Sequence, residues 1–164
     1  MKLLTPRRFD GSIAEAHETA RAQVEPLFLP ASIFSDERGW SLMNLFQGVL
    51  GPQGQINYSV MYPGVIKAWH RHSRQSDMWL VTMGHLKLGV HNQDDGRSWL
   101  AVIGEKNPGI MIIPPPLWHG ATATGGQPGG VLYYVSAAYD PADPDEQRRP
   151  FDSIEGFTWE TRHG

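Results

Sequence analysis

The chain has 164 residues and a formal charge of -3, and it contains no long basic run of the kind that binds nucleic acid. It has no cysteine, which excludes disulfides, thiolate metal sites and cysteine nucleophiles. No apolar run approaches the roughly 18 residues of a membrane-spanning helix, and the N-terminus lacks the apolar centre of a signal peptide. We therefore expect a cytoplasmic protein without nucleic-acid or membrane partners.

One helix is predicted near the N-terminus, over residues 12–24. Ser12 and Glu15 have the spacing of a capping box, alanines fill the middle, and Pro26 ends the segment. The 18 glycines and 13 prolines argue against further long helices, because both residues interrupt them. We expect residues 1–27 to form an N-terminal arm and helix, and residues 28–164 to form a single β-barrel domain with a C-terminal tail.

The rest of the chain carries the pattern of short strands separated by turns. Apolar and alternating runs predict strands at residues 40–46, 56–62, 78–83, 85–91, 99–103, 110–113 and 131–137. The segment 120–130, rich in Gly and Thr, is predicted to be a mobile connector. Phe151, Phe157 and Trp159 are expected to anchor the tail on the barrel or on a second subunit. This pattern predicts an all-β barrel or jelly roll, which encloses a pocket when its inner face is polar.

A possible metal site stands out between residues 64 and 84. His70 and His72 are two residues apart, so on a strand they point to the same face. Asp77 follows after a turn, and His119 comes after a second apolar run. Three imidazoles and one carboxylate suit a divalent Zn, Fe, Ni, Mn or Cu ion, and the sequence does not choose among them. Because Asp is shorter than Glu, Asp77 has the alternative roles of orienting a histidine or acting as a base.

The spacing of these residues resembles the two motifs of the cupin superfamily. The first motif is matched by Gly64, His70, His72, Asp77 and Gly84, with Asp where Glu is customary. The segment 109–119 resembles the second motif, with Pro116 where Gly is usual. The resemblance implies a single-domain cupin jelly roll.

A narrower resemblance covers roughly residues 30–160 and is to the dTDP-4-dehydrorhamnose 3,5-epimerase family. The similar segments are residues 34–39, 55–59, 65–70, 113–120 and 132–139. This resemblance implies an isomerase that acts on a keto-sugar, including nucleotide-linked ones, by removing a proton next to the carbonyl. It also implies a homodimer.

The same resemblance implies roles for individual residues. His70 matches the general base, and Tyr133 matches the proton donor on the opposite face of the sugar. The residues that match the nucleotide-diphosphate ligands are Arg38, Gln55 and Asn57. Lys67 keeps a positive charge where the family has arginine. Trp69 and Trp118, each directly before a candidate ligand, are expected to shape the pocket rim.

Two of these interpretations compete, because one lone pair of His70 cannot both bind a metal and accept a proton. If His70 is a ligand, the base would be Asp77, Tyr133 or a metal-bound hydroxide. The sequence also leaves two other functions open: a metal-dependent oxygenase or lyase acting on a small polar or aromatic substrate, and a ligand-binding cupin without catalysis. Fold alone does not decide among them, because one barrel hosts many activities.

Overall fold

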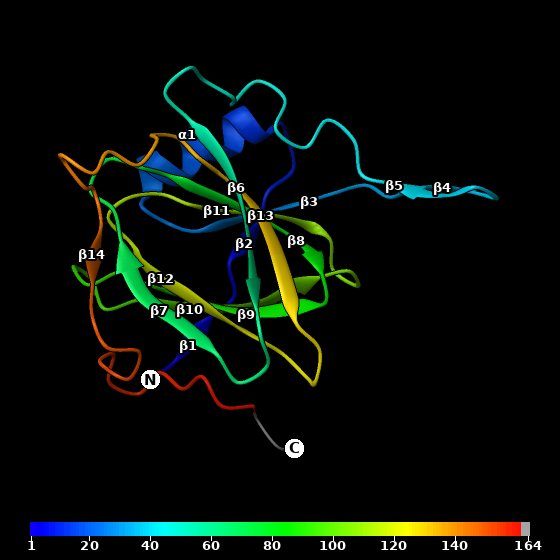
Figure 1. Cartoon of the computed structure of the whole chain (residues 1–164). Helices are drawn as coiled ribbons and strands as arrows, with labels where there is room; N and C mark the ends of the chain where they lie inside the picture. The colour runs from blue at the N-terminus through cyan, green and yellow to red at the C-terminus, as the bar shows by residue number, and fades with distance from the viewer. Residues whose placement is uncertain (162–164) are drawn as a thin grey trace.

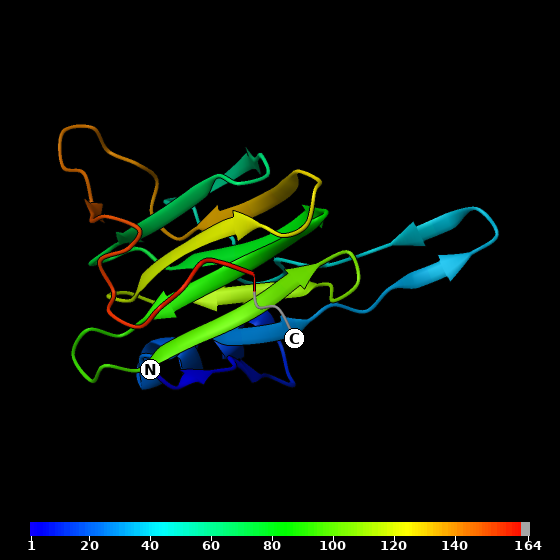
Figure 2. The same ribbon diagram turned by 90° about the horizontal axis from the view of Figure 1, so that it is seen from below.

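Two six-stranded β-sheets face each other and enclose the core (Figure 1). The structure is a computed structural model that describes residues 1–161, and residues 162–164 of the predicted barrel domain lie outside the described part. The sheets, here called sheet I and sheet II, are layered in the perpendicular view of Figure 2. This architecture confirms the predicted all-β jelly roll.

The strands of each sheet come from distant parts of the chain. Sheet I has the spatial order β1 (Leu3–Leu4), β10 (Ser98–Gly104), β9 (His85–His91), β12 (Trp118–Ala123), β7 (Ile66–Arg71) and β14 (Gln147–Arg148). Sheet II has the order β2 (Arg7–Arg8), β3 (Leu27–Pro30), β11 (Gly109–Ile113), β8 (Asp77–Met83), β13 (Gly129–Val135) and β6 (Gln55–Met61). A separate two-stranded hairpin consists of β4 (Phe34–Asp36) and β5 (Gly39–Ser41).

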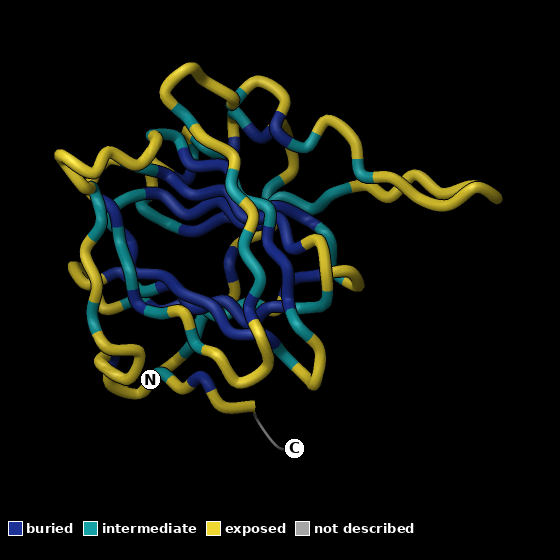
Figure 3. The backbone as a smooth tube through the Cα atoms, in the orientation of Figure 1, coloured by how far each residue is buried: buried dark blue, intermediate teal, exposed yellow. Residues whose placement is uncertain are grey.

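The core lies between the sheets, where the tube in Figure 3 is dark blue. Strand β9 shows how the sequence builds it, because Leu86, Leu88 and Val90 alternate along the strand and are all buried. They pack with apolar residues of the facing sheet, such as Trp79 and Met111. The predicted strand at 85–91 is confirmed, since alternation with period two places one set of side chains on the core face.

The helix α1 (Ile13–Gln23) packs on the outside of sheet II. Its capping box is formed as predicted, because Ser12 and Glu15 exchange side-chain and backbone hydrogen bonds. The buried face of the helix joins a second apolar cluster that includes Met78 and Ile112 of sheet II. The residues before the helix, predicted as an N-terminal arm, take part in the barrel. Strands β1 and β2 extend the two sheets through parallel pairing.

The predicted strand at 40–46 is wrong beyond Ser41. Strand β5 ends at Ser41, and turns follow, with Asn44 in the left-handed region at φ 57°. Strands β4 and β5 instead form a hairpin that projects away from the barrel (Figure 1). The hairpin turns around Arg38, whose backbone N–H donates to the carboxylate of Asp36 over 2.9 Å.

The predicted mobile connector is wrong for residues 120–123, which belong to the fully buried strand β12. This strand pairs with both β7 and β9, and its pairing with β7 is irregular around Gly120. A side chain at Gly120 would place Cβ only 2.3 Å from the Cβ of Ala68. The small residues that suggested a flexible segment are therefore required by close packing of the two strands.

The C-terminal tail folds back over the outer face of sheet I. Phe157 and Trp159 pack against Trp69 with ring centroids 4.8 and 4.9 Å away, which confirms two of the three predicted anchors. The side chain of Phe151 is 50% exposed, so it is not an apolar anchor. Its backbone carbonyl instead accepts hydrogen bonds from the indole N–H groups of Trp69 and Trp159. Within residues 1–161, no helix has the length and apolarity needed to cross a membrane.

Candidate functional site

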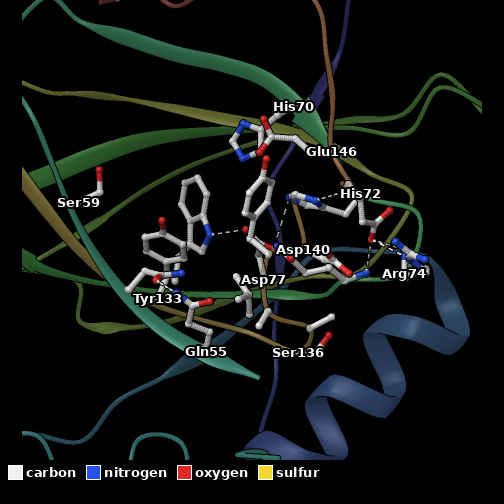
Figure 4. Close-up of a pocket in the computed structure, with 18 of the residues that line it drawn as sticks. Gln55, Ser59, His70, His72, Arg74, Asp77, Tyr133, Ser136, Asp140 and Glu146 are labelled. Carbon is white, nitrogen blue, oxygen red and sulfur yellow. Dashed lines mark hydrogen bonds and ion pairs between the residues drawn. The ribbon is translucent and has the colours of Figure 1, made fainter. Parts of the chain in front are cut away.

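A pocket of about 1090 Å³ opens between the two sheets. Its walls come from strands β6, β7, β8 and β13, and the segment 138–148 passes along its edge (Figure 4). The open end of the barrel is thus bounded by the strands that carry the predicted site residues.

The four predicted metal ligands come together at this pocket. His70 ends up on β7 and pairs in register with His119 on β12. His72 follows β7 directly, and Asp77 is the first residue of β8. One ligand atom from each residue lies within 4.8 Å of the others. The structure therefore brings together residues as far apart in the chain as His70 and His119.

Two of the histidines are held so that the same ring nitrogen faces the cluster. Nδ1 of His119 donates to the backbone carbonyl of Leu117 over 2.9 Å, and Nδ1 of His72 donates to the carbonyl of Asp145. Their Nε2 atoms face Asp77, at 3.4 and 3.8 Å from its carboxylate oxygens. Nε2 of His119 is buried and makes no hydrogen bond within the described chain. Metal-binding histidines are commonly fixed in this way through their second nitrogen.

Asp77 is fully enclosed and supplies the negative charge of the cluster. Its two oxygens accept hydrogen bonds from the Gln75 side-chain amide over 2.7 Å and from the Trp79 indole N–H over 3.0 Å. Burial alone would raise the pKa of Asp77, but close contact with His119, the positive charge of His119 and His72, and the hydrogen bond from Gln75 hold that pKa well below its usual value. A carboxylate of this kind stays ionised and accepts protons poorly. It suits the role of ligand or orienting group better than that of base.

His70 and Tyr133 both pack against Trp79. The His70 ring stacks on Trp79 with a centroid distance of 6.2 Å, and Tyr133 contacts the same indole, also at 6.2 Å. Burial and then the charge of His119 lower the pKa of His70 well below its usual value. Burial and the charge of Asp77 raise the pKa of Tyr133. At neutral pH the pocket therefore holds a neutral imidazole and a protonated phenol.

A polar strip follows the edge formed by β6 and β7. Gln55 donates to Asn57 over 2.8 Å, and both side chains line the pocket. Nζ of Lys67 donates to the Ser59 hydroxyl over 2.8 Å. Lys67 has no carboxylate within ion-pair distance in the part of the chain that the structure describes. This strip offers donors and one uncompensated positive charge to a ligand.

Three predicted substrate-binding residues lie elsewhere. Trp69 and Trp118 are buried on the outer face of sheet I, under the C-terminal tail, so the expectation that they shape the pocket rim is wrong. The reason is strand alternation, since a residue directly before an inward-facing ligand must face outward. Arg38 lies at the tip of the projecting hairpin, where its side chain is 83% exposed and pairs with Asp36.

The sequence analysis missed Asp145, which organises the turn between His72 and Asp77. Its carboxylate accepts hydrogen bonds from the backbone N–H groups of Ser73, Arg74 and Gln75 and from the Ser73 hydroxyl. No local sequence pattern predicts this contact, because the partners are about 70 residues apart. The turn that separates two candidate ligands is thus held by the tail.

Asp145→Asn is expected to reduce the free energy of unfolding at pH 7 by about 2 kcal/mol. Hydrogen bonds from Ser73 and its neighbours outweigh burial and lower the pKa of Asp145 from 3.8 to about 2. The carboxylate therefore stabilises the fold above pH 4, and this contribution disappears as the pH falls toward 2. Urea unfolding at pH 7 and pH 3 measures the difference.

The matched control for this substitution is Asp143→Asn on the same segment. Asp143 is 71% exposed and pairs with Arg74, so its loss is expected to change stability by less than about 1 kcal/mol. Equal losses in the two variants would contradict the role given to Asp145.

The chain is similar to known proteins of polysaccharide and glycan biosynthesis. The family model described as "Polysaccharide biosynthesis C-terminal domain" matches residues 34–147. The spore coat polysaccharide biosynthesis protein SpsL of Bacillus subtilis is 35% identical over 135 residues, covering 77% of this chain and 89% of that protein. The probable low-salt glycan biosynthesis epimerase Agl13 of Haloferax volcanii is 39% identical over 101 residues, covering 58% of this chain and 65% of that protein.

Solved structures with the same fold include sugar-nucleotide enzymes. A dTDP sugar isomerase from Desulfovibrio desulfuricans superposes with a TM-score of 0.72 at 24% identity, covering 82% of this chain and 90% of that one. A dTDP-4-dehydrorhamnose 3,5-epimerase from Sulfolobus tokodaii gives a TM-score of 0.68 at 21% identity, covering 79% and 80%. At these identities the likeness establishes the fold, which is the fold that the sequence resemblance implies. The extent of the family match and the relationship to SpsL show that the chain belongs to the polysaccharide biosynthesis C-terminal domain family.

Proposed function

We propose that this protein is an epimerase or isomerase that acts on a keto-sugar carried by a nucleotide. The observation that carries the proposal is the pairing of a neutral His70 with a protonated Tyr133 around Trp79, inside one pocket. The names of the related proteins support it, because they include a glycan biosynthesis epimerase.

The proposed chemistry is a proton transfer at the carbon next to the sugar carbonyl. His70 takes the proton from that carbon, and the electron pair of the broken C–H bond moves toward the carbonyl oxygen to form an enolate. Tyr133 then gives its phenolic proton to the opposite face of the same carbon, and the electron pair returns to form the new C–H bond. The configuration is inverted. His70 then releases to solvent the proton that it took, and the Tyr133 phenolate regains a proton from solvent.

The polar strip is proposed to hold the diphosphate of the nucleotide. Lys67 is the positive charge of this strip, and Gln55 and Asn57 add amide donors along β6. A phosphate group there would gain charge-assisted hydrogen bonds from Lys67 without breaking an existing ion pair. The sugar would then extend toward His70 and Tyr133.

The residues present also fit a divalent metal ion, which would be held by His72, Asp77 and His119. The support is the buried, unpartnered Nε2 of His119, together with fixed histidine orientation and an ionised carboxylate. When bound, such an ion acts as a Lewis acid that stabilises negative charge on an oxygen. Three protein ligands are enough for a catalytic site, so His70 remains available as the base in our proposal.

Deuterium uptake from D₂O into a nucleotide-linked 4-keto-sugar tests the function, and Tyr133→Phe tests the acid. We expect the wild-type protein to exchange the hydrogen next to the carbonyl and to invert that carbon. Tyr133→Phe should lower net inversion by about 100-fold or more while exchange through His70 continues. Mass spectrometry reports exchange, and NMR of the sugar reports inversion.

Tyr134→Phe is the matched control. This neighbour on β13 faces the other side of the strand and does not line the pocket. Its ring packs in the second apolar cluster, and its hydroxyl accepts a hydrogen bond from the backbone N–H of Gly51. We expect inversion to be retained in this variant. Failure of the wild-type protein to exchange any nucleotide-linked keto-sugar would refute the proposed function.

We further propose that the protein is a homodimer joined by the β4–β5 hairpin. The hairpin and its base expose large apolar side chains that one copy leaves uncovered, namely Ile33, Phe34, Trp40 and Met43. Arg38 matches a diphosphate ligand of the epimerase family, yet its own pocket does not include it. A hairpin that reaches over a second copy would cover the apolar side chains and deliver Arg38 to that copy's pocket.

Trp40→Ser is expected to weaken dimerisation by about tenfold or more, because Trp40 is 62% exposed on the hairpin and is the type of residue that dominates interfaces. Sedimentation velocity over a concentration series measures the change. Val102→Ser, which removes a 44% exposed apolar residue on β10, is the control and should leave association unchanged. A wild-type protein that is monomeric at micromolar concentration would contradict the proposal.

A further inference from the structure

The outer face of sheet I carries two arginines on one tryptophan, on the side opposite to the barrel pocket. The guanidinium carbons of Arg71 and Arg149 lie 4.7 and 4.2 Å from the ring centroid of Trp118. Arg71 directly follows His70 on β7, so alternation sends it outward while His70 faces inward. Trp118 pairs with His91 on the neighbouring strand β9, which adds an ionisable ring to the same row.

The charge of this pair is not neutralised within the described chain. Nε of Arg71 donates to the side-chain oxygen of Gln147 over 2.8 Å, a neutral partner. Nε and Nη2 of Arg149 are buried and have no hydrogen-bond partner among residues 1–161. Burial and the charge of Arg71 lower the pKa of Arg149, so the environment disfavours its positive charge. A buried donor without an acceptor is unfavourable, and more so when it is charged.

The same protein shows how a stacked arginine is neutralised when no ligand is needed. Arg97 stacks on Trp99 with a distance of 4.9 Å, and it forms ion pairs with Glu25 and Asp95. Two arginines stack on Trp118, whereas one stacks on Trp99. Neither arginine on Trp118 forms an ion pair with a carboxylate of the described residues. An unneutralised pair with free guanidinium donors has the composition of an oxyanion site.

We propose that Arg71 and Arg149 bind a phosphate group on the outer face of sheet I. Two guanidinium groups match a dianion, whereas a single carboxylate would leave one charge uncompensated. Both arginines are half-buried, so the pair is reached from solvent. The phosphate would supply acceptors to the edge of Arg149 that lacks them. This site is separate from the barrel pocket, because Trp118 packs in the outer cluster with Trp69 and Trp159 while His119 on the opposite face of β12 contacts Asp77 of the pocket.

Binding of inorganic phosphate, followed by calorimetry and by thermal unfolding at constant ionic strength, tests the proposal. We expect phosphate to bind to the wild-type protein and raise its Tm, and Arg149→Gln to weaken binding by about tenfold or more. Arg71→Gln should do the same, and it keeps the test valid if the first variant fails to fold, since Arg71 has only one neutral hydrogen-bond partner. Arg149→Lys should bind more weakly than wild type, because lysine lacks the planar fork.

Two controls separate this site from other sources of phosphate binding. Lys67→Ala should keep the phosphate affinity of the outer site. This variant distinguishes the outer site from the polar strip proposed to bind the nucleotide, so that either proposal can fail without the other. Arg97→Gln, a stacked arginine that already has carboxylate partners, should keep it as well. Loss of binding in Lys67→Ala with retention in both Arg71→Gln and Arg149→Gln would overturn the inference. So would an equal rise in Tm with acetate.

Discussion

His70→Asn is expected to lower the rate of proton exchange next to the sugar carbonyl by about 10²–10⁴-fold. The expectation follows from the position of His70 in the pocket, where its imidazole is held neutral and its pKa is lowered by burial and by His119. Asn keeps a polar side chain of similar reach but cannot take a proton from carbon. Deuterium uptake at saturating substrate measures the loss directly.

The metal content of the same variant decides between the two roles of His70. If His70 is the base, His70→Asn retains the bound ion while exchange is lost. If the ion disappears together with exchange, His70 is a ligand and the assigned base is wrong. His85→Asn is the control, because His85 begins β9 outside the pocket and accepts a hydrogen bond from the backbone N–H of Lys106.

His72→Ala and His119→Ala should each weaken binding of a divalent metal by about 100-fold or more. Changes in groups that only support metal ligands typically cost about 10–100-fold, so removal of a ligand is expected to exceed that range. Each variant deletes a ring whose Nε2 faces Asp77 and whose Nδ1 is held by a backbone carbonyl. Elemental analysis after dialysis against each metal, with chelator competition, measures the affinity.

The outcome of this experiment also bears on the electrostatics of the cluster. Asp77 is ionised and buried, and the Nε2 atoms of His72 and His119 lie 3.8 and 3.4 Å from its carboxylate oxygens. His85→Ala, which changes a histidine outside the cluster, should leave metal binding intact. A wild-type protein that takes up no ion from any of the five candidate metals would remove the metal from the mechanism. The deuterium exchange assay would still test the proposed roles of His70 and Tyr133.

The sequence predicts much of the barrel because its strands have a clear period. Strand β9 is recognised from the alternation of Leu86, Leu88 and Val90, and the capping box of α1 from Ser12 and Glu15. The grouping of His119 with His70 is different, since no local pattern links residues on separate strands. It is predictable only because the spacing resembles a known motif.

The errors have physical causes that lie outside any short window of sequence. Gly120 looks like a flexible position, but it is small because Ala68 of the neighbouring strand packs against it. Asp145 looks like part of a polar tail, although four hydrogen bonds tie it to the turn beside His72. Trp69 and Trp118 could have been assigned correctly, since alternation alone turns them away from the pocket.

The contact of the tail with His72 gives the carboxyl-terminal segment an influence on the chemistry of the barrel. The carbonyl of Asp145 selects which nitrogen of His72 carries hydrogen, and β14 lies against the strand that bears His70. Exchanging this segment between relatives would therefore change which nitrogen of His72 carries hydrogen, even if every inward-facing side chain of the barrel were kept. Chimeras that vary only the last thirty or so residues offer a way to retune the reaction without touching the residues that perform it.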